Sequence, residues 1–394
     1  MKRVLLLCNK VPFPPRDGST IAMASTIRSL IHAGAEVTVL ALNTAKHKVV
    51  DFSAVDKPDG VNWNIIDVNT SPSFTGLLSN TLFSTNSYMV TRFDRKDVRR
   101  KLRRILESEA FDAALIEGLF MMPYSDEFTE RKIPVYMRAH NVEHQIWERH
   151  IQREKSVLRK AILKIQNRRL KKYETSSLSE VKAVLPITDV DAQWFLKSLN
   201  ESQVYTLPCG INPESYPNYP SSTPDVFHIG AMDWLPNVDG IKWFAQKVWP
   251  ELMKINRESS FHLAGRQSDT LGIHRPELGF FVEGQVRSAE KFYEKHGIFV
   301  VPLLSGSGMR IKVLEAMAYG KAIIGTTIAV EGIPIESGVH GIIADQPREF
   351  AKAIDKLIVD SELRLELGKN ARKLVQEKYD EHVLGVNLLN FMAR

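Results

Sequence analysis

Residues 298–332 read IFVVPLLSGSGMRIKVLEAMAYGKAIIGTTIAVEG, and this stretch decides the fold. It opens with an apolar run, 298–301, that is typical of a buried strand. A loop of small residues, 305–308, leads into a segment at 309–319 whose apolar residues recur at helical spacing, and a second apolar run follows at 321–326. The pattern therefore predicts a strand, a glycine-rich loop, a helix and a second strand.

The loop and the start of the helix have the properties of an anion-binding site. Glycines let backbone N–H groups approach a phosphate closely, and the helix dipole favours negative charge at this end. Arg310 and Lys312 add two cations, and Glu315 stands three residues after Lys312, where it could accept hydrogen bonds from ribose hydroxyls. A structural loop with a Lys312–Glu315 surface pair explains the same residues, so the pattern alone leaves both interpretations open.

The segment 306–321, Gly-Ser-Gly-Met-Arg-Ile-Lys-Val-Leu-Glu-Ala-Met-Ala-Tyr-Gly-Lys, resembles the donor-binding motif of the retaining GT-B glycosyltransferases of family 4, the glycosyl transferases group 1. In that family the motif holds a nucleotide diphosphate-sugar, and Glu315 matches the glutamate that binds the ribose. A further glutamate usually stands eight positions earlier, where this chain has Ser307. The chain resembles the subset with Gly-x-Gly-x-Arg-x-Lys-x-x-Glu-Ala, and the departure concerns the sugar contact rather than the nucleotide contact.

The resemblance implies an α/β fold with two doubly wound, Rossmann-like parallel-sheet domains that face each other across a cleft (GT-B). It implies transfer of a sugar, with retained configuration, from a nucleotide diphosphate-sugar donor to a hydroxyl of a glycan or lipid-linked acceptor, in cell-surface polysaccharide or glycoconjugate synthesis. No cofactor and no metal are expected, because Arg310 and Lys312 can neutralise the departing diphosphate. A nucleotide-sugar epimerase of the same architecture and a nucleotide-binding module without catalysis are the alternatives.

Composition is consistent with this class. A chain of 394 residues with 44% hydrophobic and 25% charged residues predicts two globular domains. No apolar run approaches the roughly 20 residues of a membrane span, and the apolar run at 4–8 is too short for a signal peptide. With two cysteines, Cys8 and Cys209, no disulfide framework is expected, which favours the cytoplasm.

The first half of the chain begins with a predicted βαβ unit: strand 4–8, loop 9–19, helix 20–33 and strand 36–42. Ligands of such sheets bind at the carboxyl ends of the strands, where this loop lies, although a proline-stiffened connector explains it equally well. Further strands are predicted at 62–68, 112–117, 133–139, 183–188 and 204–207, and helices at 93–110 and 189–198, whereas 69–93 remains unassigned. The alternation predicts a mostly parallel, doubly wound sheet.

His140 follows one of these strands within the sequence Arg138-Ala139-His140-Asn141-Val142-Glu143-His144. The pattern H-x-x-E-H matches a zinc metalloprotease motif, which requires both histidines on one helix. A structural histidine is a second interpretation. In the resembling family, a polar residue of this region contacts the transferred sugar or the acceptor, so His140 is the predicted site residue.

Residues 152–172 contain nine Lys or Arg residues and one acidic residue, Glu154. Leu158, Ile162 and Ile165 recur at helical spacing, which predicts a basic amphipathic helix. Solvent, nucleic acid and an anionic membrane surface are the three candidate partners. Aromatic platforms are absent from the segment, so we expect no nucleic acid, and we hypothesise a peripheral contact with the inner face of the membrane.

Prolines, a glycine and serines concentrate at 208–224, and Pro208-Cys209-Gly210-Ile211-Asn212 resembles the segment that joins the two domains in the family. We predict an acceptor-side domain at 1–208, a linker at 209–224, a nucleotide-sugar-binding domain at 225–378 and a C-terminal helix at 379–394 that packs back on the first domain. In the second domain, strands are predicted at 226–230, 261–264, 280–283, 298–302, 321–326 and 341–344, and helices at 238–253 and 348–379.

The site residues follow from the motif and the resemblance. The predicted catalytic residues are His140, Arg310, Lys312 and Glu315. The predicted donor-binding residues are Gly18, Gly230, Arg266, Gly306, Ser307, Gly308, Met309 and Leu314. Trp234-Leu235-Pro236-Asn237, after the first strand of the second domain, occurs in similar family members.

Overall fold

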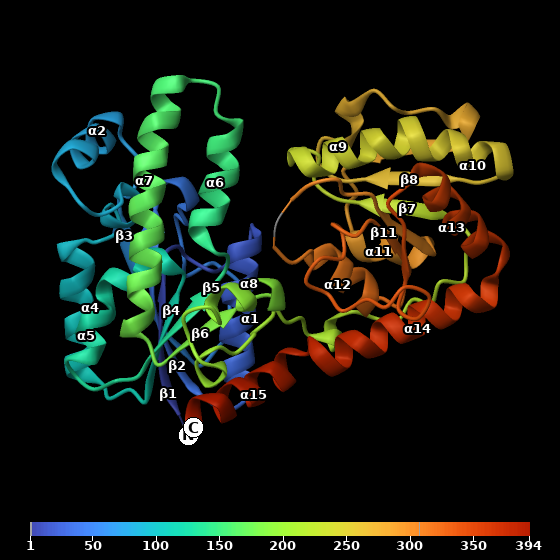
Figure 1. Ribbon diagram of the computed structural model, residues 1–394. Coiled ribbons are helices and arrows are strands. Elements are labelled where there is room, and N and C mark those ends of the chain that lie inside the picture. Colours follow the sequence, from blue (N-terminus) through green and yellow to red (C-terminus); the bar gives the residue numbers. More distant parts are fainter. Residues whose placement is uncertain (1, 307) are drawn as a thin grey trace. The chain divides into compact units, whose positions relative to one another are not determined.

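The computed structural model describes residues 2–306 and 308–394. The chain forms two compact units: the first comprises Met1–Gly210 with Glu381–Arg394, and the second comprises Ile211–Asp380 (Figure 1). Each unit contains a six-stranded sheet in which every neighbouring pair is parallel. The two sheets confirm the predicted α/β class with two doubly wound units.

The sheet of the first unit has the order β3-β2-β1-β4-β5-β6. Its strands are β1 (Arg3–Cys8), β2 (Glu36–Thr44), β3 (Val61–Val68), β4 (Ala113–Glu117), β5 (Val135–Ala139) and β6 (Ala183–Pro186). Alternate residues of β1 enter two different cores, with Leu5 and Leu7 on one face and Leu6 on the other. Both faces of β1 are therefore covered, which is why this strand is apolar throughout.

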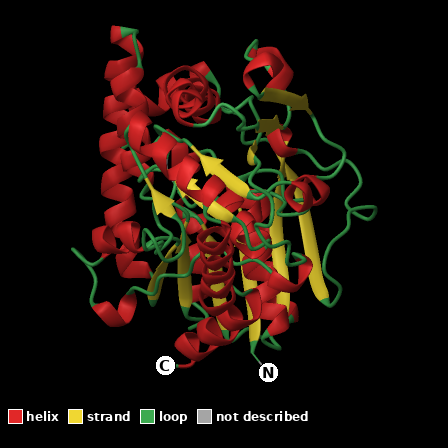
Figure 2. Ribbon diagram, turned by 90° about the vertical axis from the view of Figure 1, so that its right-hand side faces the viewer, coloured by secondary structure: helices red, strands yellow, loops and turns green. Residues whose placement is uncertain are grey.

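Helices cover both faces of this sheet. They are α1 (Gly18–His32), α2 (Phe74–Phe83), α3 (Tyr88–Thr91), α4 (Lys96–Ser108), α5 (Ser125–Thr129), α6 (Glu143–Arg153), α7 (Val157–Ser176), α8 (Asp189–Phe195) and α15 (Glu381–Ala393). Helices α1 and α15 share one core, whereas α4, α5 and α7 contribute to the other. The described start of the chain lies near α15, the last helix (Figures 1 and 2), and Lys2 Nζ donates a hydrogen bond to Leu389 O over 3.4 Å.

The sheet of the second unit has the order β12-β11-β10-β7-β8-β9. Its strands are β7 (Val226–Ile229), β8 (Phe261–Ala264), β9 (Phe280–Gly284), β10 (Ile298–Val301), β11 (Ala322–Gly325) and β12 (Ile342–Ile343). Its helices are α9 (Leu235–Trp243), α10 (Trp249–Ile255), α11 (Ala289–Lys295), α12 (Ile311–Ala318), α13 (Pro347–Val359) and α14 (Ser361–Lys378). A π-helical segment, Phe244–Val248, joins α9 to α10, so the helix predicted at 238–253 has one irregular turn.

Two segments of the first unit differ from the prediction. Residues 204–207 form no strand: Val204 makes an isolated bridge to Val184, and Leu207 N donates to Pro186 O over 2.8 Å. The unassigned region contains α2 and α3. Within the described part of the chain, no helix combines the length and the apolar character that crossing a bilayer requires.

The apolar stripe predicted for 152–172 is also wrong. A break at 154–156 separates α6 from α7, and in α7 Ile162 is buried whereas Leu158 and Ile165 are 69% and 44% exposed. The buried line of α7 consists of Ile162, Gln166, Leu170 and Glu174. Gln166 can be buried because its amide oxygen accepts from Tyr88 N over 2.7 Å and its amide nitrogen donates to Asn80 Oδ1 over 2.9 Å.

Candidate functional site

The glycine-rich loop, residues 305–308, lies between β10, which ends at Val301, and α12, which begins at Ile311. Gly306 and Gly308 have φ angles of +135° and +75°, a region that favours glycine. A Cβ atom on Gly306 would lie 2.9 Å from the Arg310 guanidinium and 3.5 Å from the Trp234 ring, so the residue must stay small. Ser307 lies outside the described residues.

The buried Arg310 side chain hydrogen-bonds to the backbone of this loop. It is 4% exposed, and its guanidinium donates to the carbonyl of Gly308 and, over 3.5 Å, to that of Ile328. The half-buried Met309 packs against the core of the second unit. Arg310 therefore holds the backbone of the loop in place.

Lys312 lies one residue into α12 and points toward β7. Its Nζ donates to Asn237 Oδ1 over 2.7 Å and lies 3.5 Å from His228 Nε2. Asn237 is held in this orientation because its amide nitrogen donates to Ala231 O over 2.8 Å. His228 Nδ1 lies 2.7 Å from Val300 O and must donate to it, which leaves Nε2 as an acceptor facing Lys312.

The lack of a side chain at Gly230 leaves space for the Lys312 ammonium group. A Cβ atom on Gly230 would lie 2.8 Å from Lys312 Nζ, so only glycine fits there. Gly265 follows β8, and a Cβ atom on it would lie 1.9 Å from Gly230 O. The loops after β7 and β8 therefore meet beside the start of α12.

Burial shifts both ionisable groups of α12. Desolvation and the nearby Arg310 lower the pKa of Lys312 to about 7, against the opposing effect of Glu315. Burial raises the pKa of Glu315 to about 6, although Tyr216 and Lys312 favour its charged form. Tyr216 Oη lies 3.5 Å from Glu315 Oε1. Among the described residues no carboxylate lies within 4.0 Å of Lys312 Nζ, so the surface-pair interpretation is wrong.

The remaining predicted residues of the second unit occupy different surroundings. Arg266, after β8, is exposed and pairs with Asp233 Oδ2 over 2.9 Å. The Leu314 side chain is fully buried in the core, and its N–H donates to Arg310 O over 3.4 Å. Leu314 therefore supports α12 from within, and its side chain cannot reach a ligand.

In the first unit, Gly18 is the exposed first residue of α1. His140 follows β5, and its Nε2 lies 2.7 Å from Glu117 Oε2 at the end of β4. Glu117 is fully buried and also lies 3.8 Å from Arg138 Nε. His140 Nδ1 is buried and has no partner among the described residues.

The zinc interpretation of H-x-x-E-H does not agree with this arrangement. His140 precedes α6, whereas His144 lies inside it and pairs with Glu174 Oε2 over 2.6 Å. The two histidines therefore contact different carboxylates and do not form a ligand pair on one helix. Within 2–306 and 308–394, no group of three or more His, Cys, Asp or Glu residues could hold a metal ion.

Sequence reasoning did not identify three contacts of these sites: His228, Asn237 and Glu117. His228 is the only polar residue in the strand 226–229, a signal that could have singled it out. Asn237 belongs to the Trp234–Leu235–Pro236–Asn237 segment that follows the strand 226–229, and Glu117 ends a predicted strand. Both therefore follow the carboxyl ends of strands, where ligands of such sheets bind.

Known proteins resemble the chain at the level of family and fold. The family model described as glycosyl transferases group 1 matches residues 223–360. An uncharacterised 44.6 kDa protein in the cps region of Klebsiella pneumoniae is 23% identical over 294 residues, which are 72% of this chain and 74% of that protein. The putative glycosyltransferase YtcC of Bacillus subtilis is 42% identical over 65 residues, 16% of each chain.

Solved structures extend the likeness over the whole chain. Anabaena HepE in complex with UDP has a TM-score of 0.65 at 11% identity, and the match covers 100% of both chains. Sucrose-phosphate synthase from Thermosynechococcus elongatus has a TM-score of 0.68 at 14% identity and covers 100% of this chain and 98% of its own. Residues 223–360 therefore match the family model of the glycosyl transferases group 1, and the chain as a whole has two doubly wound units of the GT-B type, the fold of these solved structures.

Proposed function

We propose that the protein transfers a sugar from a nucleotide diphosphate-sugar to a hydroxyl group of an acceptor, with retention of the anomeric configuration, and that the second unit holds the donor. The observation that carries this proposal is the buried Lys312, which has no acidic partner within 4.0 Å among the described residues and stands at the start of α12 beside the glycine-rich loop. Complexes of HepE with UDP and with UDP-glucose support a donor of this class.

The start of α12 suits a diphosphate for three reasons. Its first N–H groups have no partner within the helix, the helix dipole is positive at this end, and Lys312 adds a cation. Arg310 shapes the loop from below. These groups would stabilise the negative charge that develops on the leaving diphosphate, so we propose a reaction that requires no metal ion.

Glu315 suits the ribose. It lies one turn further along α12, and a carboxylate can accept hydrogen bonds from both ribose hydroxyls. Gly230, Arg266 and Met309 remain proposed donor contacts, and Gly18 and His140 remain proposed contributions of the first unit.

The acceptor is proposed to be a glycan or a lipid-linked glycan in the synthesis of a cell-surface polysaccharide, on the cytoplasmic side of the membrane. The relative from a cps region of Klebsiella pneumoniae supports this assignment.

We also propose a peripheral contact of the first unit with an anionic membrane. Helix α2 is uncharged, and its exposed Phe74, Leu78 and Leu82 recur every four residues, on one face. Arg169 of α7 ties α2 in place by donating to Asn80 O and Thr81 O over 3.0 and 2.9 Å. Helix α7 lies beside α2 (Figure 1) and carries seven of the nine basic residues of the segment 152–172. The two helices together therefore present apolar and cationic side chains.

Donor binding and turnover test the central proposal. We expect Lys312→Ala to slow transfer about 100-fold or more, since it removes one preorganised charge from the leaving group. Glu315→Ala should weaken donor binding about tenfold, the value of one lost hydrogen bond to a charged group, and also lower turnover. The measurements are titration of nucleotide-sugars into the full chain and assay of transfer or donor hydrolysis.

Lys295→Ala and Glu294→Ala are matched controls, because both residues are exposed on α11. Activity should be equal in EDTA and in magnesium. Kinetics that are unchanged in both α12 variants would refute the assignment of the donor site.

A further inference from the structure

A pocket of about 330 Å³ opens in the first unit, and none of its lining residues is among the site residues assigned above. Its lining comes from the carboxyl ends of four neighbouring strands. Asn9 and Lys10 follow β1, Thr44 ends β2, Thr70 follows β3, and Phe120 follows β4. In the sheet, β1 lies between β2 and β4. The strand order runs outward from β1 to β3 on one side and from β4 to β6 on the other, and ligands of open α/β sheets bind at such a switch point.

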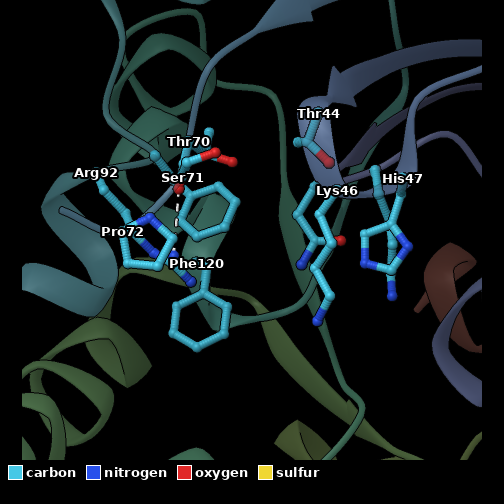
Figure 3. Close-up of a pocket in the computed structure, with 11 residues that line it drawn as sticks. Thr44, Lys46, His47, Thr70, Ser71, Pro72, Arg92 and Phe120 are labelled. Atoms are coloured by element: carbon cyan, nitrogen blue, oxygen red, sulfur yellow. Dashed lines mark hydrogen bonds between the residues drawn. The ribbon is translucent and has the colours of Figure 1, made fainter.

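Four basic side chains line this pocket, and no acidic side chain among the described residues does: Lys10, Lys46, His47 and Arg92. Figure 3 shows Arg92 and Phe120 on one side of the pocket, with Thr44, Lys46 and His47 on the other. The lining also includes the hydroxyl-bearing Thr70 and Ser71 on the Arg92 side and Thr44 on the Lys46 side (Figure 3), which add hydrogen-bonding groups.

Two of these side chains lie beside a carboxylate and two do not, and burial lowers the pKa of His47, so this residue adds little positive charge near neutral pH. Lys10 Nζ lies 2.9 Å from both carboxylate oxygens of Asp17, the N-cap of α1, and His47 lies 3.8 Å from the same carboxylate. Lys46 and Arg92 have no carboxylate within 4.0 Å among the residues that the structure describes. The pocket therefore has an excess of positive charge that its own residues leave unmatched.

Arg92 has donor groups that its described neighbours do not use. Its Nη1 donates to Thr70 O over 3.2 Å, and its Nε is buried with no partner in the described structure. Its guanidinium lies 4.8 Å from the centre of the Phe93 ring, which stacks on Phe120 at 5.5 Å. The guanidinium is thus held at the edge of an apolar wall, with donors left for an oxyanion.

We infer that this pocket binds an oxyanion of the acceptor, either a phosphate or a sugar carboxylate, so that the acceptor substrate is anionic. Arg92 and Lys46 bind the oxyanion, the hydroxyl groups donate to it, and Phe120 contacts the adjoining apolar or sugar part. The inference rests on the proposed transfer reaction and adds the chemical class of its acceptor. It uses no residue of the proposed donor site.

The test separates the pocket from the donor site by working in the Lys312→Ala background, where diphosphate binding at α12 is weakened. Inorganic pyrophosphate and glucuronate are titrated separately into the full chain by calorimetry. Hydrogen exchange then locates the protection, which we expect in peptides that cover 44–48, 69–73 and 90–93. Binding should weaken at high salt, because the contacts are ionic.

Arg92→Gln and Lys46→Gln, each added to this background, should weaken oxyanion binding about tenfold or more, the value of a charge-assisted hydrogen bond. Lys48→Gln and Arg104→Gln remove the same charge from exposed side chains outside the pocket and should leave binding unchanged. Lys46 is exposed, so its variant tests the pocket even if Arg92→Gln alters folding.

Each outcome gives a distinct result. Binding of pyrophosphate alone assigns a phosphorylated acceptor, and binding of glucuronate alone assigns an acidic sugar. If neither probe binds, or if both pocket variants bind like the controls, the inference is overturned, whereas nucleotide-sugar binding by the wild-type chain leaves the proposed function intact. If the wild-type chain binds no nucleotide-sugar while Arg92-dependent oxyanion binding persists, the proposed function fails and the anionic pocket stands.

Discussion

Lys312 carries its ammonium group into the interior of the second unit, where it contacts Asn237 and His228. Burial removes the ammonium group from water, Arg310 repels it and neither contact supplies a negative charge, so the pKa of Lys312 falls to about 7. A donor diphosphate at the start of α12 would supply the missing charge. In the free protein the pKa of Lys312 therefore lies close to neutral pH, so small changes in pH change its protonation.

Donor binding should accordingly be coupled to proton uptake by Lys312. Above pH 7 the free protein holds a largely neutral Lys312, and binding of the diphosphate must return a proton to it, so affinity should fall as pH rises, by at most tenfold per unit. Below about pH 6 Glu315 becomes protonated and loses acceptor capacity for the ribose, so affinity should fall there too. Calorimetry in buffers of different ionisation enthalpy measures the uptake.

The matched control for this coupling is Lys312→Met, which should show no proton uptake at pH 8 and should bind the donor weakly. Burial lowers the pKa of His228 well below its usual range, so His228 should stay neutral throughout. Equal proton uptake in the wild type and the Met variant would contradict the assignment to Lys312.

Residue spacing was enough to place Arg310, Lys312 and Glu315 at one helix end, because the three residues stand within six positions of one another. It was not enough to find their partners. Lys312 and Asn237 are 75 residues apart, and Glu117 and His140 are 23 apart, so these contacts arise only when strands become neighbours in the sheet. The burial of the Leu314 side chain was not predicted for a related reason: the core that this side of α12 faces forms only when distant segments pack together.

At the scale of elements, α15 completes one core of the first unit by packing on α1. Leu384, Leu388 and Met392 of α15 enter that core, and Glu381 is fully buried with its Oε1 2.5 Å from Arg28 Nη2. Gly385 is the point of closest approach, since a Cβ atom on it would lie 1.8 Å from Ser29 O.

Gly385→Ala should therefore separate α15 from α1 and destabilise the first unit by about 2 kcal/mol, which is within the range measured for overpacked cores. We expect faster hydrogen exchange in both helices and a lower midpoint of denaturant unfolding. Gly18→Ala provides the comparison: Gly18 is helical, and a Cβ atom on it would meet nothing within 4 Å, so this variant should gain about 0.5–1 kcal/mol. Similar stability of the two variants would show that the close approach does not limit this packing.

Most strands were predictable as elements because a strand covered on both faces is a short apolar run, whereas β3 and β12, at the edges of their sheets, are only partly buried. Helix α7 was not predictable in the same way. Its buried residues include Gln166 and Glu174, which hydrogen-bond to other segments. The spacing of the apolar residues Leu158, Ile162 and Ile165 therefore predicted a different buried face from the one that the helix has. Helix α2 was not assigned, although Phe74, Leu78 and Leu82 recur at helical spacing: the segment is short and uncharged, and none of its residues enters a core.

At the scale of the whole molecule, the location of activity depends on whether the first unit binds a membrane. Phe83 is 87% exposed and Leu82 is 66% exposed at the end of α2, and Val157 and Leu158 are 84% and 69% exposed at the start of α7. Burying one such side chain contributes about 1.5–3 kcal/mol, and each nearby Lys or Arg contributes about 1 kcal/mol at an anionic surface. One insertion and a few cations are therefore enough for reversible binding.

Phe83→Ser should consequently reduce binding of the full chain to vesicles that contain phosphatidylserine by about tenfold or more, measured by co-sedimentation at low salt. Val359→Ser is the matched control, because Val359 is 76% exposed but ends α13 in the second unit, and it should bind like the wild type. Raised salt should weaken binding and neutral vesicles should retain little of it, since the cations act within a Debye length. If the wild type does not sediment with anionic vesicles at low salt, α2 is not a membrane contact. If Phe83→Ser and the wild type sediment equally while salt still releases both, the basic face of α7 binds the surface without insertion of α2.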